Sequence, residues 1–374
     1  GWHDAAFFNM LRPLELTFTN GHEDGELVTV ETGDVTKMTS FDELYRAYKK
    51  QMKYSIALMV NAINAIDYAH AERSPLPFES CLTDGCFESG KCVEQGGAVY
   101  NFTGPQGFGI ANVSDALYAI KQLVFEQKKY TLADFRQAMA DNFGKGLTKL
   151  DMEHITKAVI ASVAASGQEI SEDVVKAVCT QVAASGEVSE ERRRFYEQML
   201  EDIDSVPKYG NDLEEVDLFA RDVAYTYTKP LETFKNPRGG IYQAGLYPVS
   251  ANVPLGAQTG ATPDGRLSGA PIADGVGPAA GRDKLGPTAA ANSVARLDHF
   301  IASNGTLYNQ KFHPSALAGV KGLDDFVSLI RTYFDRKGMH VQFNVVSKET
   351  LLDAQQHPEK YRTLVVRVAG YSAL

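Results

Sequence analysis

The chain has 374 residues, of which 44% are hydrophobic and 22% are charged, and its formal net charge is −10. This composition is typical of a folded globular protein, and the acidic balance argues against a nucleic-acid or anionic-membrane surface. Glycine and proline are spread through the sequence and mark no linker, so we expect a single α/β domain. Four cysteines, without zinc spacing, are too few for a disulfide framework; they predict a reducing cytoplasm and no metal site.

The N-terminal part of the sequence predicts mainly helices. Residues 2–20 begin with an aromatic-rich turn and continue with apolar residues at mixed helical spacing, which predicts a buried helix. Residues 39–69 are typical of a long amphipathic helix that Thr39 or Ser40 would cap. Residues 96–107 combine paired glycines, a short apolar run and a Gly-Pro turn, which predicts a strand that leaves the core and turns sharply.

The middle of the chain contains a short internal repeat. Residues 163–167 return as residues 182–186, and each copy ends a helical stretch at glycine and is followed by a capping serine. Two copies are too few for a solenoid, so residues 147–200 predict a small helical hairpin inserted in the domain. No function follows from this repeat.

The C-terminal part of the sequence alternates strands with helices. After a loop-rich stretch with a predicted strand at 246–253, helices are predicted at 323–336 and 349–356, and strands at 340–346 and 364–366. Strand–helix–strand alternation implies parallel strands with buried faces. The expected architecture is therefore an α/β barrel or a wound sheet.

The chain ends with Arg367-Val368-Ala369-Gly370-Tyr371 after the apolar run at 364–366, which predicts a buried strand that delivers a turn into the interior. A lone glycine here would be explained by a tight turn that needs a positive φ. Arg-Val-x-Gly-Tyr after a hydrophobic strand, however, resembles the radical-bearing loop of the glycyl radical enzymes. Glycine suits that role because its Cα radical is delocalised over the flanking amides and no Cβ obstructs planarity.

Other parts of the sequence resemble the same family in the same order. These blocks are residues 2–8, 100–107, 250–254, 261–266, 302–306 and 338–344. The resemblance implies a ten-stranded α/β barrel with surrounding helices, in which one central loop carries the glycine and a facing loop carries a cysteine. Residues 1–374 would form the C-terminal part of this domain without its N-terminal half, with residues 364–374 as the radical loop.

The cysteine loop of similar enzymes, Gly-Cys-Val-Glu, lies just upstream of Trp-His-Asp, so we expect it before Gly1. Two partial copies occur within the chain, at Cys86 and Cys92, but both follow the Trp-His-Asp block. They lie in a stretch that predicts a helix with Cys81 and Cys86 as small buried residues. We therefore expect neither cysteine to be catalytic.

The block at residues 2–8 resembles the diol-dehydratase branch of the family. This implies elimination of water from a small 1,2-diol such as glycerol or propane-1,2-diol; the alternatives are a lyase for trans-4-hydroxy-L-proline, isethionate or choline, or a non-catalytic fragment that presents a radical loop. Asp4 occupies the position that holds the substrate hydroxyl or acts as acid–base group in similar enzymes. On the residues alone, Asp4 could instead cap the following helix. His3 is expected to pack beside the substrate.

The resemblance also implies the partners of the protein. A separate S-adenosylmethionine-dependent iron–sulfur enzyme would install the radical on Gly370, so no directly bound cofactor is expected. A homodimer and a small-molecule substrate are expected, without nucleic acid or membrane. The expected location is the cytoplasm, with a bacterial microcompartment within it as an alternative.

Overall fold

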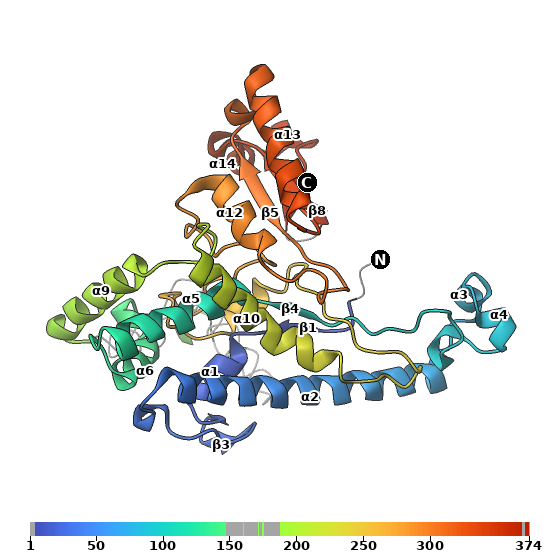
Figure 1. Ribbon diagram of the computed structural model, residues 1–374, viewed down its shortest axis with the longest axis horizontal. Coiled ribbons are helices and arrows are strands. Elements are labelled where there is room, and N and C mark those ends of the chain that lie inside the picture. Colours follow the sequence, from blue (N-terminus) through green and yellow to red (C-terminus); the bar gives the residue numbers. More distant parts are fainter. Residues whose placement is uncertain are drawn as a thin grey trace.

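The computed structural model describes residues 4–146, 160, 171, 174, 175, 188–368 and 371–373 (Figure 1). The helices are α1 (Arg12–Phe18), α2 (Phe41–Arg73), α3 (Pro77–Cys81), α4 (Cys86–Ser89), α5 (Ile110–Ile120), α6 (Leu132–Ala140), α9 (Glu190–Ser205), α10 (Glu214–Leu231), α11 (Pro254–Ala257), α12 (Gly286–Ala295), α13 (Gly319–Asp335) and α14 (Lys348–Gln356). The strands are β1 (Phe7–Asn9), β2 (His22–Glu23), β3 (Glu26–Leu27), β4 (Gln106–Phe108), β5 (Asn309–Phe312), β6 (Gln342–Val345), β7 (Val366–Val368) and β8 (Tyr371–Ala373).

Parallel pairing joins strand segments that are far apart in the sequence. β1 pairs with β4, and the segment at 103–106 bridges to the segment at 242–245. Leu246 then bridges to Thr306, and β5, a few residues further on, pairs with β6. Each of these pairings is parallel, so the predicted parallel α/β arrangement is confirmed for these segments, whereas β2–β3 and β7–β8 pair antiparallel.

Helix α10 packs against both α5 and α2, and the three helices carry much of the core (Figure 1). Every residue of α5 is buried, as expected for a helix that is covered on all sides. α2 starts at the predicted cap, where the Ser40 hydroxyl accepts a hydrogen bond from the Glu43 backbone N–H at 3.3 Å. The Glu43 carboxylate accepts in return from the Thr39 N–H at 2.6 Å, so local sequence alone fixes the start of this helix.

Three sequence-based expectations are wrong in part. Phe7–Asn9 forms strand β1 instead of a helix, because parallel pairing with β4 places Phe8 against the Tyr227 ring at 5.2 Å. The strand expected at 246–253 is only a bridge at Leu246, and a turn leads from it into α11. The final run is not a buried strand: Val365 is 56% exposed, and β7 starts at Val366 and pairs antiparallel with β8.

The remaining elements follow the prediction closely. α13, β6 and α14 lie where helix, strand and helix are expected, with ends that differ by a few residues. The predicted hairpin at 147–200 lies largely outside the described residues, except for α9, whose cap is Ser189 as expected from the sequence. None of the described helices is long and apolar enough to cross a membrane.

Candidate functional site

Asp4 lies just before β1, with an exposed side chain, and its carboxylate is near the hydroxyl of the fully buried Tyr247. Burial raises the pKa of Tyr247, and the nearby Asp4 carboxylate raises it further. Tyr247 therefore stays protonated, with a neutral hydroxyl beside Asp4. The two residues are brought together by the strand pairings, because Tyr247 follows the segment at 242–246.

Two carboxamide side chains hold the Tyr247 oxygen from other directions. Gln106 Nε2 donates to it at 3.1 Å and Asn304 Nδ2 at 3.3 Å. Both amides also donate to the Gly104 carbonyl, at 2.7 Å and 3.2 Å. We call Asp4, Gln106, Tyr247 and Asn304 the polar cluster; its formal charge is carried by the Asp4 carboxylate, and its other members are neutral.

An apolar patch adjoins the polar cluster. Leu307 and Val249 pack against Tyr247. Val249 has φ +55°, which is unusual for a β-branched residue and costs on the order of 1–3 kcal/mol. Backbone strain of this kind is concentrated at functional sites, where the surrounding structure holds it in place.

Glycines allow the strands to approach closely at the polar cluster. A Cβ on Gly104 would lie 2.3 Å from Asn304 Nδ2. A Cβ on Gly245 would lie 2.8 Å from the Tyr247 ring and 3.0 Å from Asn304 Nδ2. Distances under 3.0 Å are too short for carbon, so any larger residue at these positions would displace the amide or the phenol.

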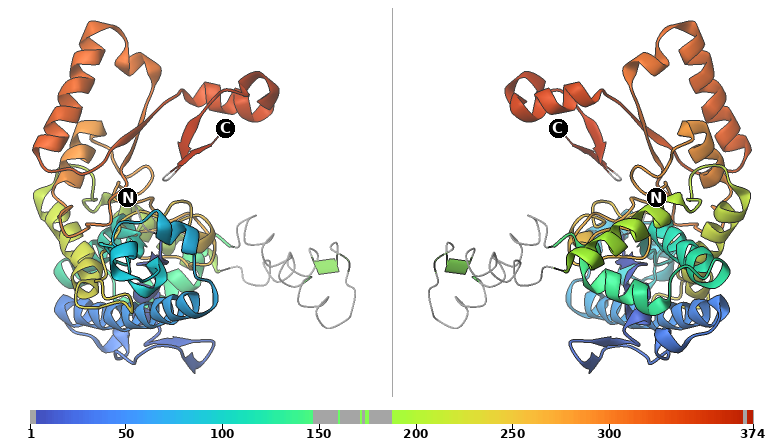
Figure 2. Two further views of the ribbon diagram at one scale, coloured as in Figure 1. Left: turned by 90° about the vertical axis from the view of Figure 1, so that its right-hand side faces the viewer. Right: turned by 90° about the vertical axis from the view of Figure 1, so that its left-hand side faces the viewer.

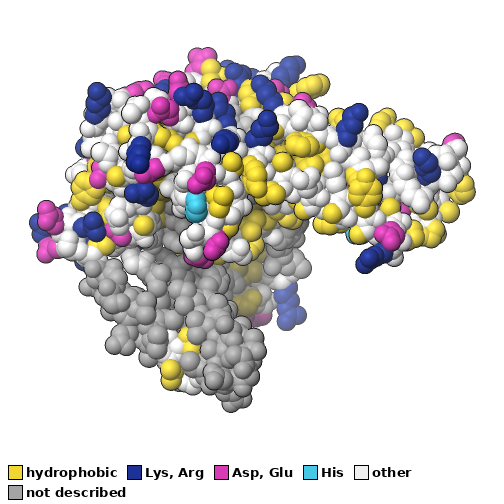
Figure 3. Space-filling view, turned by 90° about the horizontal axis from the view of Figure 1, so that it is seen from below, with side chains coloured by type: hydrophobic (Ala, Val, Ile, Leu, Met, Phe, Trp, Pro, Cys, Tyr) yellow, Lys and Arg dark blue, Asp and Glu magenta, His cyan; other side chains and the backbone are white. Residues whose placement is uncertain are grey.

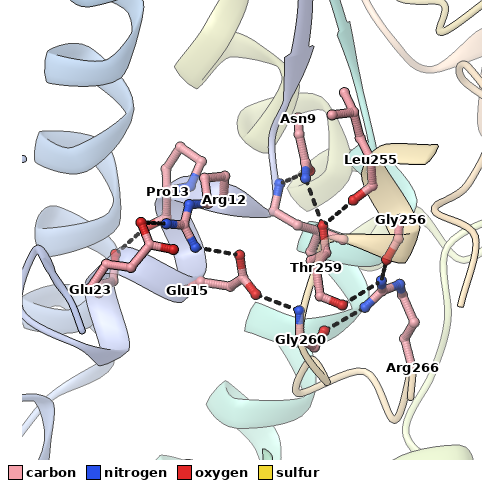
Figure 4. A network of polar contacts seen from close by, with 12 residues as sticks. Asn9, Arg12, Pro13, Glu15, Glu23, Leu255, Gly256, Thr259, Gly260 and Arg266 are labelled. Atoms are coloured by element: carbon pink, nitrogen blue, oxygen red, sulfur yellow. Dashed lines mark hydrogen bonds and ion pairs between the residues drawn. The ribbon is translucent and has the colours of Figure 1, made fainter. Parts of the chain in front are cut away.

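The loop that follows α11 is fastened to β1 and α1 (Figure 4). Asn9 Nδ2 donates to the Thr259 hydroxyl at 2.9 Å, and the Gly260 N–H donates to the Glu15 carboxylate at 2.7 Å. The guanidinium of the buried Arg266 donates to four backbone carbonyls, those of Gly256, Thr259, Gly260 and Ala270, at 2.6–3.1 Å. The block at 261–266 therefore has a structural role, since Arg266 holds the loop closed.

The alternative role for Asp4 as a helix cap is wrong. The residues after Asp4 form β1, and α1 starts only at Arg12, with Leu11 at its N-cap position. The Asn9 side chain, which accepts from the Leu11 N–H at 3.0 Å, supports this turn instead. Asp4 is thus left with Tyr247 as its partner.

Two predicted site residues lie outside the described residues. His3 is one, and Gly370, which falls in the sequence between β7 and β8, is the other. β7 and β8 themselves pair antiparallel, and β7 contacts β6. The assignments of His3 and Gly370 therefore remain predictions.

The cysteines of the partial motifs belong to a lobe of α3 and α4 that projects beyond the end of α2, away from β1 (Figure 1). Cys86 is buried, and burial raises the pKa of its thiol, which disfavours the reactive thiolate. Cys81 is exposed, so its expected burial is wrong: it ends the five-residue helix α3, whose buried residue is Ser80. Figure 3 shows apolar side chains gathered on this projection. Phe78 of α3 and Phe87 of α4 are both exposed.

No set of three or more His, Cys, Asp or Glu side chains within the described part of the chain is arranged to hold a metal ion. The chemistry of the polar cluster is thus that of a carboxylate, a phenol and two amides. Such a set can hold and orient a molecule with several hydroxyl groups.

The family described as pyruvate formate lyase-like matches residues 1–256, and the glycine radical domain matches residues 272–374. The chain therefore belongs to the pyruvate formate lyase-like family of glycyl radical proteins, as the sequence blocks predict.

Several relatives match nearly the whole chain. One solved structure, described as concerning 1,2-propanediol dehydration in Roseburia inulinivorans, is 62% identical with a TM-score of 0.90. The match covers 100% of this chain and 45% of the chain in that structure. The B12-independent glycerol dehydratase of Clostridium butyricum is 47% identical, with a TM-score of 0.84 and coverage of 100% and 41%. The (2S)-3-sulfopropanediol dehydratase of Klebsiella oxytoca is 36% identical over 379 residues, 100% of this chain and 40% of its own. The chain thus spans less than half the length of these relatives.

Sequence reasoning missed three members of the polar cluster as site residues. Gln106 and Asn304 lie within the family blocks at 100–107 and 302–306, so a signal existed for them. Tyr247 lies outside all the blocks, in what looks like an ordinary apolar strand. Only the strand order reveals that its hydroxyl meets Asp4.

Arg266→Lys should lower the thermal unfolding midpoint of the full-length protein. One ammonium group cannot reach four carbonyls that a planar guanidinium contacts, and each lost bond to a charged donor costs about 1.5–3 kcal/mol. The matched control is Arg12→Lys in the same network, where a partly exposed arginine pairs with Glu15 and Glu23 and little change is expected. Equal midpoints for the two variants would contradict the structural role of Arg266.

Proposed function

We propose that the full-length protein is a glycyl radical dehydratase that eliminates water from a small 1,2-diol, such as propane-1,2-diol or glycerol. The observation that carries the proposal is the position of the exposed Asp4 carboxylate near the Tyr247 hydroxyl, which Gln106 and Asn304 hold by hydrogen bonds. A carboxylate that is exposed on one side can accept a substrate hydroxyl, while the phenol and the amides keep the carboxylate in place. Family membership and the dehydratase relatives support the reaction class.

The charge of the polar cluster favours a neutral diol over other substrates. Its members carry one negative charge, on Asp4, and three neutral groups. The sulfonate of isethionate would be repelled by Asp4, whereas a diol needs only hydrogen-bond donors and acceptors. Trans-4-hydroxy-L-proline, isethionate and choline remain the alternatives within the family.

In the proposed reaction, Gly370 stores the radical and a cysteine of the expected upstream loop removes hydrogen from the carbon that bears a hydroxyl. Asp4 holds that hydroxyl and takes up its proton, while an acid protonates the neighbouring hydroxyl so that it leaves as water; the cysteine then returns its hydrogen to the product radical. His3 packs beside the substrate. A separate S-adenosylmethionine-dependent iron–sulfur enzyme installs the radical, and the active protein is a homodimer.

The proposed architecture of the full-length protein is a single ten-stranded α/β barrel. The parallel pairings from β1 to β6 support it, because they form a run of neighbouring strands with helices packed around it. A non-catalytic radical-loop fragment is less well supported. The family match extends over residues 1–256, far more than a loop carrier requires.

Gly370→Ala should abolish the organic radical. The expected result for the anaerobically activated, full-length wild-type protein is a glycyl radical signal by electron paramagnetic resonance, because only glycine gives a planar, unobstructed Cα radical. Gly277→Ala is the control, since a Cβ there meets only the Tyr308 ring at an ordinary 3.5 Å. An undiminished signal in Gly370→Ala would refute the assignment.

Asp4→Asn should lower turnover roughly 10²–10⁴-fold, the usual worth of a positioned acid–base group, and leave the radical yield unchanged. Asparagine keeps the size of the side chain and a hydrogen-bond acceptor at this position, so the loss would report the missing charge. Asp24→Asn, an exposed change at positive φ in the turn between β2 and β3, is the control. The assay follows consumption of propane-1,2-diol, glycerol, trans-4-hydroxy-L-proline, isethionate and choline, and use of only the last three would contradict the diol assignment.

Gly245→Ala should reduce turnover about 10–100-fold without loss of the radical, because a new Cβ 2.8 Å from the Tyr247 ring must displace the phenol and misplacement by about 1 Å is that costly. Gly277→Ala serves again as the matched control. Normal turnover in Gly245→Ala would mean that Tyr247 is not part of the substrate site.

A further inference from the structure

Three polar side chains form a continuous line across β5 and β6. Asn309 Nδ2 donates to the Asp274 carboxylate, and Asn309 Oδ1 accepts from Gln342 Nε2. Asn309 and Gln342 lie directly opposite each other in the parallel β5–β6 pair. We call Asp274, Asn309 and Gln342 the amide ladder.

The first member of the amide ladder is fixed in position by its loop. The Val276 N–H donates to the Leu307 carbonyl at 2.8 Å, and a Cβ on Gly275 would lie 2.2 Å from that carbonyl oxygen. The loop is thus held in close backbone contact with the segment that leads into β5. Burial raises the pKa of Asp274, while the hydrogen bond from Asn309 opposes this shift, so loss of Asn309 would leave a largely buried carboxyl group without that donor.

A second set of contacts holds the same strands through aromatic rings. Phe312 of β5, Phe343 of β6 and Phe326 of α13 have ring centroids 4.7–5.9 Å apart. Apolar packing is non-directional and a pair of four-residue strands is marginal by itself. The amide ladder is directional: a slip of one residue would replace Gln342 by a neighbour whose side chain points to the other face.

The register of β6 matters because the C-terminal segment continues from it. Figure 2 shows the chain running from β6 out to α14, away from the helical body, and the β7–β8 strands returning toward the body, and β7 contacts β6. A slip of one residue would move this segment by about 3.3 Å along the strand. Hydrogen transfer between a glycine and a cysteine requires near contact, so a displacement of that size would matter to it.

We propose that Asn309, held between Asp274 and Gln342, is a positioning residue that sets the register of β6 and thereby the location of strands β7 and β8, between which Gly370 falls in the sequence. The inference rests on the proposed radical role of Gly370. It assigns the ladder no contact with substrate.

The test compares Asn309→Leu and Gln342→Met, which remove ladder hydrogen bonds at nearly constant volume, with Asp274→Asn, whose amide oxygen still accepts from Asn309. Val345→Thr is the control, because Val345 lies on β6, is 47% exposed and has no place in the ladder. The first measurement is hydrogen–deuterium exchange of the full-length, unactivated protein. We expect exchange at least about 10-fold faster in β6 and residues 346–368 of both ladder variants, and nearly wild-type exchange in Asp274→Asn and Val345→Thr.

The second measurement is made after anaerobic activation. We expect the two ladder variants to form the radical in wild-type yield but to turn over the diol at least about 10-fold more slowly, with Asp274→Asn near normal. Unchanged exchange in β6 of both ladder variants would overturn the proposal. Faster exchange throughout the protein would also overturn it, because the effect would not be specific to β6. A third contradicting result would be normal turnover in variants whose β6 exchanges faster. Gln342→Met keeps the test valid if Asn309→Leu does not fold. Because the exchange measurement needs no radical, it tests the amide ladder separately from the proposed function. Failure of the proposed function would instead appear as an activated wild-type protein that gives no radical signal.

Discussion

Parallel backbone pairing between distant segments is the constraint on which the rest of the structure depends. It places the start of β1 beside residue 104 and the segment at 242–246 beside both β4 and Thr306. Each neighbour contributes one member of the polar cluster, so the cluster exists only when all the strands are aligned. The glycines at 104 and 245 follow from the same constraint, because side chains there would occupy the space of Asn304 and Tyr247.

The elements that the sequence predicts correctly are those that local interactions determine. α2 begins directly after Ser40 because two hydrogen bonds fix this end. The Ser40 hydroxyl accepts from the Glu43 N–H, and the Glu43 carboxylate accepts from the Thr39 N–H. β1 could not be predicted in this way. Three residues, Phe7–Asn9, become a strand because β4, a hundred residues later, supplies the hydrogen bonds and Tyr227 supplies the packing surface.

The residues of the candidate site also differ in whether short sequence blocks or distant strand pairings determine them. Asp4 and Gly370 can be proposed from short sequence blocks, since their roles depend on residue type and order. Gln106 and Asn304 lie in such blocks, but their function as donors to a phenol depends on where Tyr247 lies. Tyr247 itself has no sequence signal, because a tyrosine at the end of an apolar strand is usually a core residue; the nearby Asp4 carboxylate distinguishes it.

One strand segment connects the polar cluster to the C-terminal hairpin. Asn304 contacts Tyr247, and Asn309, on the same segment, pairs with Gln342. Asn304 lies in the turn just before the bridge at Thr306, and the chain runs on from there into β5, so the polar cluster and the register of β6 are tied to one short chain element. Both ends of that element are held by amide side chains with fixed donors and acceptors. Apolar side chains of similar size would fill the space, but they would not distinguish the native register from one shifted along the strand.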